Sequence, residues 1–276
     1  MIGRRAWLAA GVGLMLGACA TPDTALPDRA LHGARFVLLG EVHDNALQHA
    51  ARAALVRALL ADGRPTRVVF EQIDRGRDAA IAAAPRDAEA VADAAQLDRR
   101  AWGWPLHKPL LEAALAGGAR IVGGNLPRAE VRAIARGGLA AAPPALRQRI
   151  EQTPWSAAQQ SAMEALIDHG HCGTLPAAVW PAMVLAQRAR DAALAAAMLD
   201  APVGERVLLI AGNGHVRSDL GVPLVLRGAG VPPQQIVAVV YLEEGDETVP
   251  ADRVQRTPAA SREDPCAGQR GRTAPG

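Results

Sequence analysis

Five short apolar runs, separated by segments with helical periodicity, organise the chain. They are Phe36–Leu39, Thr66–Gln72, Arg120–Asn125, Val207–Gly212 and Ile236–Leu242. Continuous apolar runs of this length are typical of strands that are buried on both faces. Because the strands alternate with helices, we expect an α/β fold with a mostly parallel central sheet that helices cover on both faces.

The segment between the third and the fourth strand is almost wholly helical by pattern. It covers about residues 140–201 and includes one long amphipathic helix, Trp180–Leu199. We interpret it as a helical insertion or lid before the fourth main strand. The folded domain is then expected to span residues 31–256, followed by a polar tail with Pro and Gly over residues 257–276.

Polar side chains stand at the carboxyl ends of four of the predicted strands. They are Glu41 and His43, Glu71, Asn125, and the group Asn213, His215 and Arg217. In a parallel sheet, ligands bind outside the carboxyl ends of the strands. We therefore expect these side chains to gather at one edge of the sheet.

Glu41 and His43 are two residues apart, so they project from one face if the strand continues to its tip. A carboxylate beside an imidazole can bind a divalent metal, with His215 as a third ligand, or exchange a proton in hydrolysis. Glu71 and His215 would complete such a hydrolytic site. A purely structural reading has the polar residues capping the next helix and Glu71 in a buried ion pair with Arg217 or Arg128.

Composition excludes one class of partner. The 276-residue chain is 50% hydrophobic and 21% charged, which suffices for one large domain. Its formal net charge is +2 and only 3% of its residues are aromatic. With neither a basic field nor a set of stacking rings, the chain is not expected to bind nucleic acid.

The first residues predict export and lipidation. Arg4 and Arg5 precede a short apolar segment, and Leu16–Cys19 matches a bacterial lipobox. We expect a lipoprotein signal peptide over residues 1–18, lipidation of Cys19 and a tether over residues 19–30. Because Ala20 rather than Asp follows the cysteine, we expect an anchor on the periplasmic face of the outer membrane. An ordinary signal peptide is the alternative.

Two cysteines remain after the lipobox, Cys172 and Cys266. In an oxidising periplasm they favour a disulfide that ties the tail to the domain. The alternative is that Cys172, between His171 and Gly173 and close to His169, is a metal or haem ligand.

A loop with two tryptophans, Trp102 and Trp104, leads to His107 and could form the wall of a planar ligand site. Its structural alternative is a loop packed over a helix. The only tyrosine, Tyr241, lies at the end of the last predicted strand, where packing is favoured over iron ligation.

Six motifs together resemble the ChaN-like haem-binding lipoprotein family. They are Gly40–Asn45, Trp104–Leu110, Asn125–Arg128, His171–Pro176, Gln187–Asp191 and Gly212–Arg217. The family is similar to the wider Tiki and erythromycin-esterase-like superfamily, whose members carry Glu and His at the same strand tips for hydrolysis. The resemblance implies haem bound as a pair between two subunits, with tyrosine ligation of each iron. In this chain His107 stands where the family has that tyrosine.

Two functional hypotheses follow. The first is a haem-binding envelope lipoprotein of iron uptake, homodimeric on haem binding, that works with an outer-membrane haem or iron receptor. His107 is then the favoured axial ligand and His171 or His215 the second, with Trp104 and Arg217 beside the haem. The second is a periplasmic hydrolase that acts through a divalent metal or general base at the Glu41, His43 and His215 cluster.

Overall fold

All six strands of the central sheet run parallel, in the order β3-β2-β4-β1-β5-β6. A computed structural model describes residues 28–264 and 266–267 of the chain. The predicted α/β fold with a parallel sheet is confirmed. The strands are β1 (Phe36–Leu39), β2 (Thr66–Asp74), β3 (Arg120–Asn125), β4 (Arg206–Ile210), β5 (Ile236–Glu243) and β6 (Arg253–Thr257). The last of these was not predicted, since its charged and alternating residues suit an edge strand rather than a buried one.

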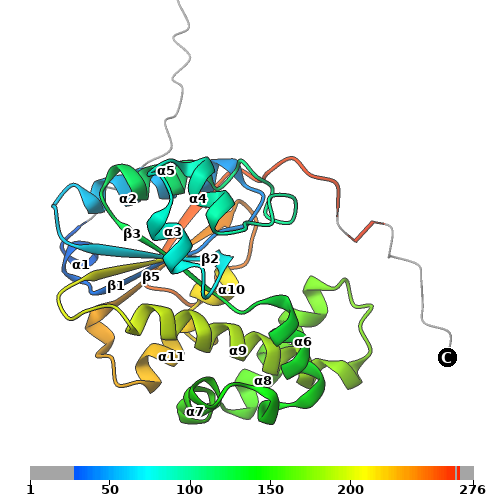
Figure 1. Ribbon diagram of the computed structural model, residues 1–276. Coiled ribbons are helices and arrows are strands. Elements are labelled where there is room, and N and C mark those ends of the chain that lie inside the picture. Colours follow the sequence, from blue (N-terminus) through cyan, green and yellow to red (C-terminus); the bar gives the residue numbers. More distant parts are fainter. Residues whose placement is uncertain (1–27, 265, 268–276) are drawn as a thin grey trace, which may run out of the picture.

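Helices cover both faces of the sheet (Figure 1). They are α1 (Arg29–Gly33), α2 (Ala46–Leu60), α3 (Asp78–Ala83), α4 (Ala88–Ala94), α5 (Lys108–Ala116), α6 (Arg128–Gly137), α7 (Pro144–Gln152), α8 (Ala157–Gly170), α9 (Trp180–Leu199), α10 (Asn213–Val216) and α11 (Val222–Gly228). None of the described helices is both long enough and apolar enough to cross a membrane.

Alternate residues of β1 enter two different cores. Val37 and Leu39 pack with α2 and α5 on one face, whereas Phe36 and Leu38 pack with α9 and α11 on the other. All four are fully buried. This two-sided burial is the reason that the strands read as continuous apolar runs.

Helix α9 does more than form part of a lid. Its residues Leu194, Ala195 and Met198 pack on the second face of the sheet beside β2 and β3. Helices α6, α7 and α8 in turn pack against α9. Small alanines on α9 allow this close approach, and the helix can therefore bring polar side chains to the carboxyl edge of the sheet.

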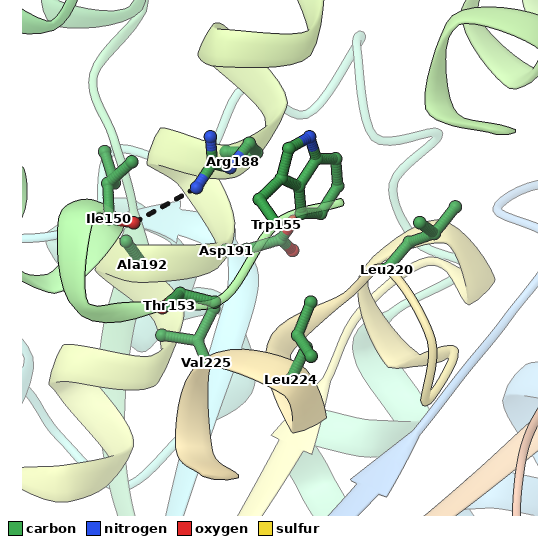
Figure 2. Close-up of a pocket in the computed structure, with 9 residues that line it drawn as sticks. All are labelled: Ile150, Thr153, Trp155, Arg188, Asp191, Ala192, Leu220, Leu224 and Val225. Atoms are coloured by element: carbon green, nitrogen blue, oxygen red, sulfur yellow. Dashed lines mark hydrogen bonds between the residues drawn. The ribbon is translucent and has the colours of Figure 1, made fainter. Parts of the chain in front are cut away.

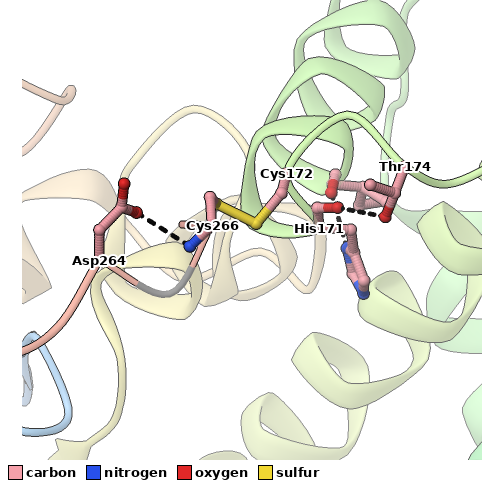
Figure 3. The surroundings of a disulfide bond; sticks show 6 residues. His171, Cys172, Thr174, Asp264 and Cys266 are labelled. Carbon is pink, nitrogen blue, oxygen red and sulfur yellow. Dashed lines mark hydrogen bonds between the residues drawn. A yellow bond between two sulfur atoms is a disulfide. The ribbon is translucent and has the colours of Figure 1, made fainter. Parts of the chain in front are cut away.

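The C-terminal segment crosses from the sheet to the end of α8. Arg262 pairs with Asp44, at a distance of 2.7 Å between Nε and Oδ2, just after the tip of β1. Cys266 then forms a disulfide with Cys172 (Figure 3). The bond rules out the alternative role of Cys172 as a thiolate ligand. The predicted signal peptide, Cys19 and most of the tether lie outside the described residues.

Candidate functional site

The carboxyl ends of β1 to β4 surround a cavity of about 1040 Å³. Predicted residues from all four strand ends line it, among them Glu41, His43, Glu71, Asn125 and His215. The fold brings them together because β1 and β2 both neighbour β4, which places three strand tips side by side. The cavity lies where ligands bind in open parallel sheets.

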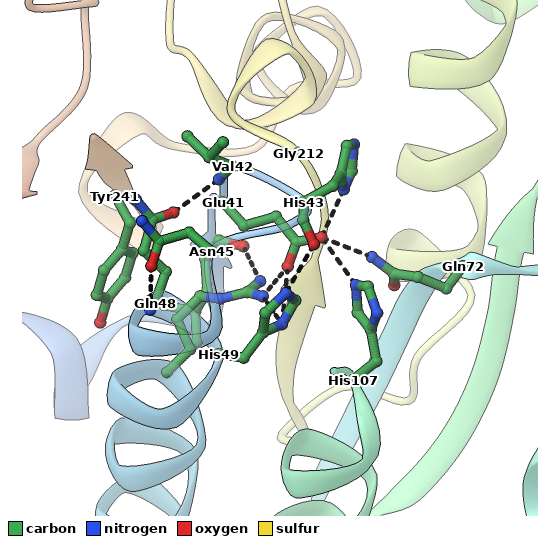
Figure 4. Close-up of polar contacts among 12 residues, drawn as sticks. Glu41, Val42, His43, Asn45, Gln48, His49, Gln72, His107, Gly212 and Tyr241 are labelled. Carbon is green, nitrogen blue, oxygen red and sulfur yellow. Dashed lines mark hydrogen bonds and ion pairs between the residues drawn. The ribbon is translucent and has the colours of Figure 1, made fainter. Parts of the chain in front are cut away.

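Glu41 is the buried centre of a polar cluster, with 2% of its surface exposed. Its Oε1 atom lies 2.6 Å from Nδ1 of His43, 2.9 Å from Nε2 of His107 and 3.1 Å from Nε2 of Gln72 (Figure 4). Its Oε2 atom pairs with Arg52 of α2. The guanidinium compensates the buried negative charge, so Glu41 can stay ionised inside the protein.

His43 is the accessible imidazole of this cluster, with 47% of its side chain exposed. Because Nδ1 faces the Glu41 carboxylate, that nitrogen carries the proton, which leaves the lone pair on Nε2. A Cβ atom at Gly212 would lie only 2.8 Å from this Nε2. Only glycine at this position therefore leaves the nitrogen free. The Trp102 ring lies edge-on to the imidazole, with centroids 5.1 Å apart.

His107 lies beneath the cavity floor and is 1% exposed. Its Nδ1 lies 3.1 Å from the carbonyl oxygen of Trp102, and its Nε2 lies 2.9 Å from Oε1 of Glu41. Burial, with the nearby Arg52, lowers the pKa of His107 to about 3. The structure thus differs from the expectation that His107 faces a planar ligand: the loop turns its imidazole inward to a buried carboxylate.

His49 on α2, which the sequence did not suggest as a site residue, supports the same cluster. Its Nε2 donates to the His43 carbonyl oxygen at 2.8 Å, and its Nδ1 accepts from Arg52 at 2.9 Å. Burial lowers the pKa of His49 to about 4. The neutral ring therefore links the loop after β1 to helix α2.

A second cluster contains Glu71 and His215. Nε2 of His215 lies 3.3 Å from Oε1 of Glu71, and its Nδ1 lies 2.6 Å from Oδ1 of Asp191. The backbone N–H of Gly212 donates to Glu71 at 2.8 Å. Burial alone would lower the pKa of His215, but the two carboxylates raise it to about 10. Burial likewise opposes ionisation of Glu71, whose pKa His215 holds at about 2.

The structure regroups the ligand set that the sequence suggested for a metal. Ligand atoms of Glu41, His43 and His107 lie within 4.8 Å of one another, and these three could hold an ion. His215 belongs to the other cluster, where both of its nitrogens face carboxylates. In the expected ligand set of Glu41, His43 and His215, His107 therefore takes the place of His215. The reason is that Asp191 on α9 forms an ion pair with His215.

Three other predicted residues lie away from the cavity lining. His171 is exposed and bonds to the carbonyl oxygen of Ile167 at 2.7 Å. Arg217 pairs with Asp219 at 2.7 Å. Trp104 packs against the core, under the guanidinium of Arg99, so Trp102 is the indole that lines the cavity. Each finds its partner on its own loop or a neighbouring element, which sequence spacing does not reveal.

Tyr241 points into the core from β5 and is 4% exposed. Burial raises its pKa to about 12. As it is the only tyrosine of the chain, the cavity has no tyrosinate ligand. The tyrosine ligation that the family resemblance implied therefore does not fit these residues, whereas the imidazole of His43 fits an iron or another metal ion.

Besides His49, sequence reasoning missed three residues that the clusters depend on. They are Arg52, Gln72 and Asp191. Of these three, only Asp191 could have been identified from the sequence, since it is the last residue of the Gln187–Asp191 motif and the only acidic residue of α9. Arg52 had no such signal, because a charged residue on an amphipathic helix is most often solvated. Gln72 on β2 had none either, since it is a neutral polar residue at a strand end.

Comparisons with known proteins agree with this architecture. Residues 29–226 match the family described as haem-binding uptake, Tiki superfamily, ChaN. The solved structure of ChaN of Campylobacter jejuni, described by its cofacial haem binding, is 21% identical with a TM-score of 0.65, over 81% of this chain and 88% of that one. No curated protein matches.

Two more distant structures are similar in part. The toxin effector domain RRSP of Vibrio vulnificus is 16% identical with a TM-score of 0.43, over 81% of this chain and 36% of that one. A mutant of the erythromycin esterase EreC is 15% identical with a TM-score of 0.42, over 76% of this chain and 70% of that one. The family match covers well over half of the residues, and the chain therefore belongs to the haem-binding uptake family of the Tiki superfamily that includes ChaN.

Proposed function

We propose that this protein binds haem at the cavity beside His43 and serves iron uptake in the bacterial envelope. The observation that carries the proposal is the half-exposed imidazole of His43, which Glu41 orients from behind, in a chain of a haem-binding family. A carboxylate that accepts from one ring nitrogen raises the basicity of the other, which suits it as a metal ligand. When bound, haem would supply its iron as the coordinating centre.

The other parts of the cavity support a flat, partly anionic ligand. Trp102 offers an indole beside His43, and Arg128 and Arg190 line the same cavity. Arg190 on α9 donates to Oδ1 of Asn125 at 2.8 Å, which fixes its guanidinium at the tip of β3. Guanidinium groups are suited to carboxylates such as those of haem.

A haemin titration of the mature domain tests the proposal. We expect a Soret shift on binding that H43A abolishes, because the variant removes the accessible nitrogen. The matched control is H171A, whose imidazole lies outside the cavity lining. An H43A variant with the wild-type spectrum and affinity would contradict the ligand assignment. Absence of any shift in the wild-type protein would contradict haem binding itself.

We further propose that haem binding joins two copies of this chain and that a lipid on Cys19 anchors the protein to the outer membrane. The lipobox at Leu16–Cys19 supports the anchor. Light scattering during the titration should detect a doubling of mass. Mass spectrometry of the mature protein should detect a lipidated Cys19, and an unlipidated N-terminus beyond it would contradict the anchor. A haem or iron receptor of the outer membrane is the proposed upstream partner.

A second candidate is a hydrolase, which the pairing of two acid–imidazole clusters favours. Glu41 with His43, and Glu71 with His215, flank the Gly212 backbone from two sides. His43 could act as a general base, or a divalent metal held by Glu41, His43 and His107 could activate the water in its place. Metal analysis of the purified protein and turnover of an ester and amide panel test it. Activity that H43A leaves intact would remove the candidate.

A further inference from the structure

Asp191 is the only charged side chain among the buried residues of α9. It is 1% exposed, and its neighbours on the buried side of α9 are Val184, Ala189, Ala192 and Leu194. A buried carboxyl group without a partner is strongly disfavoured, so its position requires an explanation. Gln187, one helical turn earlier on the same face of α9, lies 3.2 Å from both ring nitrogens of His215.

Among the described residues, the only hydrogen-bond partner of the Asp191 carboxylate is His215. Oδ1 accepts from Nδ1 of His215 at 2.6 Å, whereas Oδ2 has no partner. The other side of Asp191 faces a small void between α7, α9 and α11 (Figure 2). Arg188 lies on that side too, but its guanidinium donates to the Ile150 carbonyl oxygen. The one hydrogen bond of the Asp191 carboxylate therefore holds the imidazole of His215 on α10.

We propose that Asp191 is a positioning residue of the site, which fixes the ring of His215 so that its Nε2–H points at Glu71 and keeps that carboxylate beside His43. The proposal deepens the proposed function, on whose site it rests. The chain of contacts runs from Asp191 through His215 to Glu71, and all three residues are at most 5% exposed. Glu71 is also held by Gly212, whose backbone lies against His43.

The arrangement gives His215 a definite chemical role. Both ring nitrogens face carboxylates, Asp191 on α9 and Glu71 on β2, so both carry protons and neither offers a lone pair. Burial raises the pKa of Asp191 to about 6, which still leaves it ionised at pH 8. His215 is then a hydrogen-bond donor and a fixed positive charge at the cavity wall. It is not a ligand for iron or for another metal ion.

Nuclear magnetic resonance of the full mature chain, with ¹⁵N-labelled histidine rings, tests the proposal without reference to any ligand. At pH 8 we expect both ring nitrogens of His215 to be protonated in the wild type. In D191N the ring should lose one proton at this pH, and D191E should restore the doubly protonated form in part. V225A is the control, because Val225 lines the same void and its apolar side chain can form no hydrogen bond with His215. Its His215 signals should match the wild type.

D191N signals identical to those of the wild type would overturn the proposal, as would a His215 ring that is singly protonated in the wild type at pH 8. A haemin titration of the same variants gives a second readout. We expect D191N to weaken haemin binding by about 10-fold or more, the usual effect of losing an orienting partner, and V225A to leave it unchanged. If the wild type does not bind haemin, the proposed function fails, and the resonance experiment still decides the role of Asp191.

Discussion

The backbone of Gly212 lies against the imidazole of His43, so closely that a Cβ atom at this position would be 2.8 Å from Nε2 and 2.9 Å from Cε1. The backbone of Gly212 is extended, with φ of −65°, so alanine meets no conformational strain here. Glycine is required at this position only because a larger residue would collide with the His43 ring. Because the His43 ring is half exposed, it would move into the solvent rather than disrupt the core.

We therefore expect G212A to reduce haemin affinity by 10-fold or more, at a cost in folding stability of only about 1 kcal/mol or less. Haemin titration and urea denaturation measure the two effects. The matched control is G214A, since Gly214 lines the same cavity and a Cβ atom there meets nothing within 4 Å. Equal losses of haemin affinity in G212A and G214A would contradict this explanation, because a Cβ atom at Gly214 does not reach His43.

His107 should matter for stability rather than for the spectrum of bound haem. H107A removes a buried side chain that lies within 2.9 Å of the Glu41 carboxylate. We expect a loss of about 2–3 kcal/mol in the free energy of unfolding, with the Soret maximum of the haemin complex unchanged. Denaturation and absorbance spectroscopy check this. A variant of normal stability that has lost the Soret shift would instead identify His107 as the ligand.

The buried pair of Glu41 and Arg52 should be strongly coupled. Removing the guanidinium in R52M leaves a carboxylate buried without compensation, and we expect the stability to fall by about 3–5 kcal/mol. The double variant E41Q/R52M should recover part of this loss, because it also removes the charge. R57M, on an exposed position of the same helix, should change the stability by about 0.5 kcal/mol or less. Additive effects of E41Q and R52M would contradict the coupling.

Stability should fall as the pH drops below 6.5. Burial lowers the pKa of His49 to about 4 in the folded protein, from 6.5. Between these values the unfolded chain binds a proton that the folded one does not, so the stabilisation is complete above pH 6.5 and is lost as pH falls towards 4. The slope is up to about 1.4 kcal/mol per pH unit for one such group. Denaturation at pH 4–8 should show a flatter profile for H49Q than for the wild type.

The disulfide should contribute strongly to stability. Cys172 and Cys266 are 94 residues apart in sequence, so their bond closes a long loop in the unfolded chain. By the loop-entropy relation we expect C172S/C266S to lower the free energy of unfolding by about 4.7 kcal/mol. Reduction of the wild type should have the same effect, and none on the double variant. If the reductant lowered the stability of the double variant by a similar amount, the loss in the wild type could not be assigned to the disulfide.

The sequence by itself determined the sheet and its functional edge. Runs such as Phe36–Leu39 are apolar at every position because both faces of each strand are buried, and no surface strand would tolerate this. The polar residues after such runs then mark the carboxyl edge, so the sequence predicts that Glu41, His43, Glu71 and His215 gather at one edge of the sheet. The edge strand β6 was not predicted, since its alternating pattern of charged and apolar residues resembles a polar tail.

Only the tertiary structure decided how these residues are paired. The sequence allowed His215 to lie beside Glu41 and His43. In the fold, α9 instead places Asp191 within hydrogen-bonding distance of His215. His107 could have faced the solvent, but its loop turns it towards Glu41, and the charge of that carboxylate depends on Arg52 of another helix. Sequence periodicity specifies which face of an element is buried; it carries no information on which distant side chain lies within 3 Å, because that depends on how the helices pack.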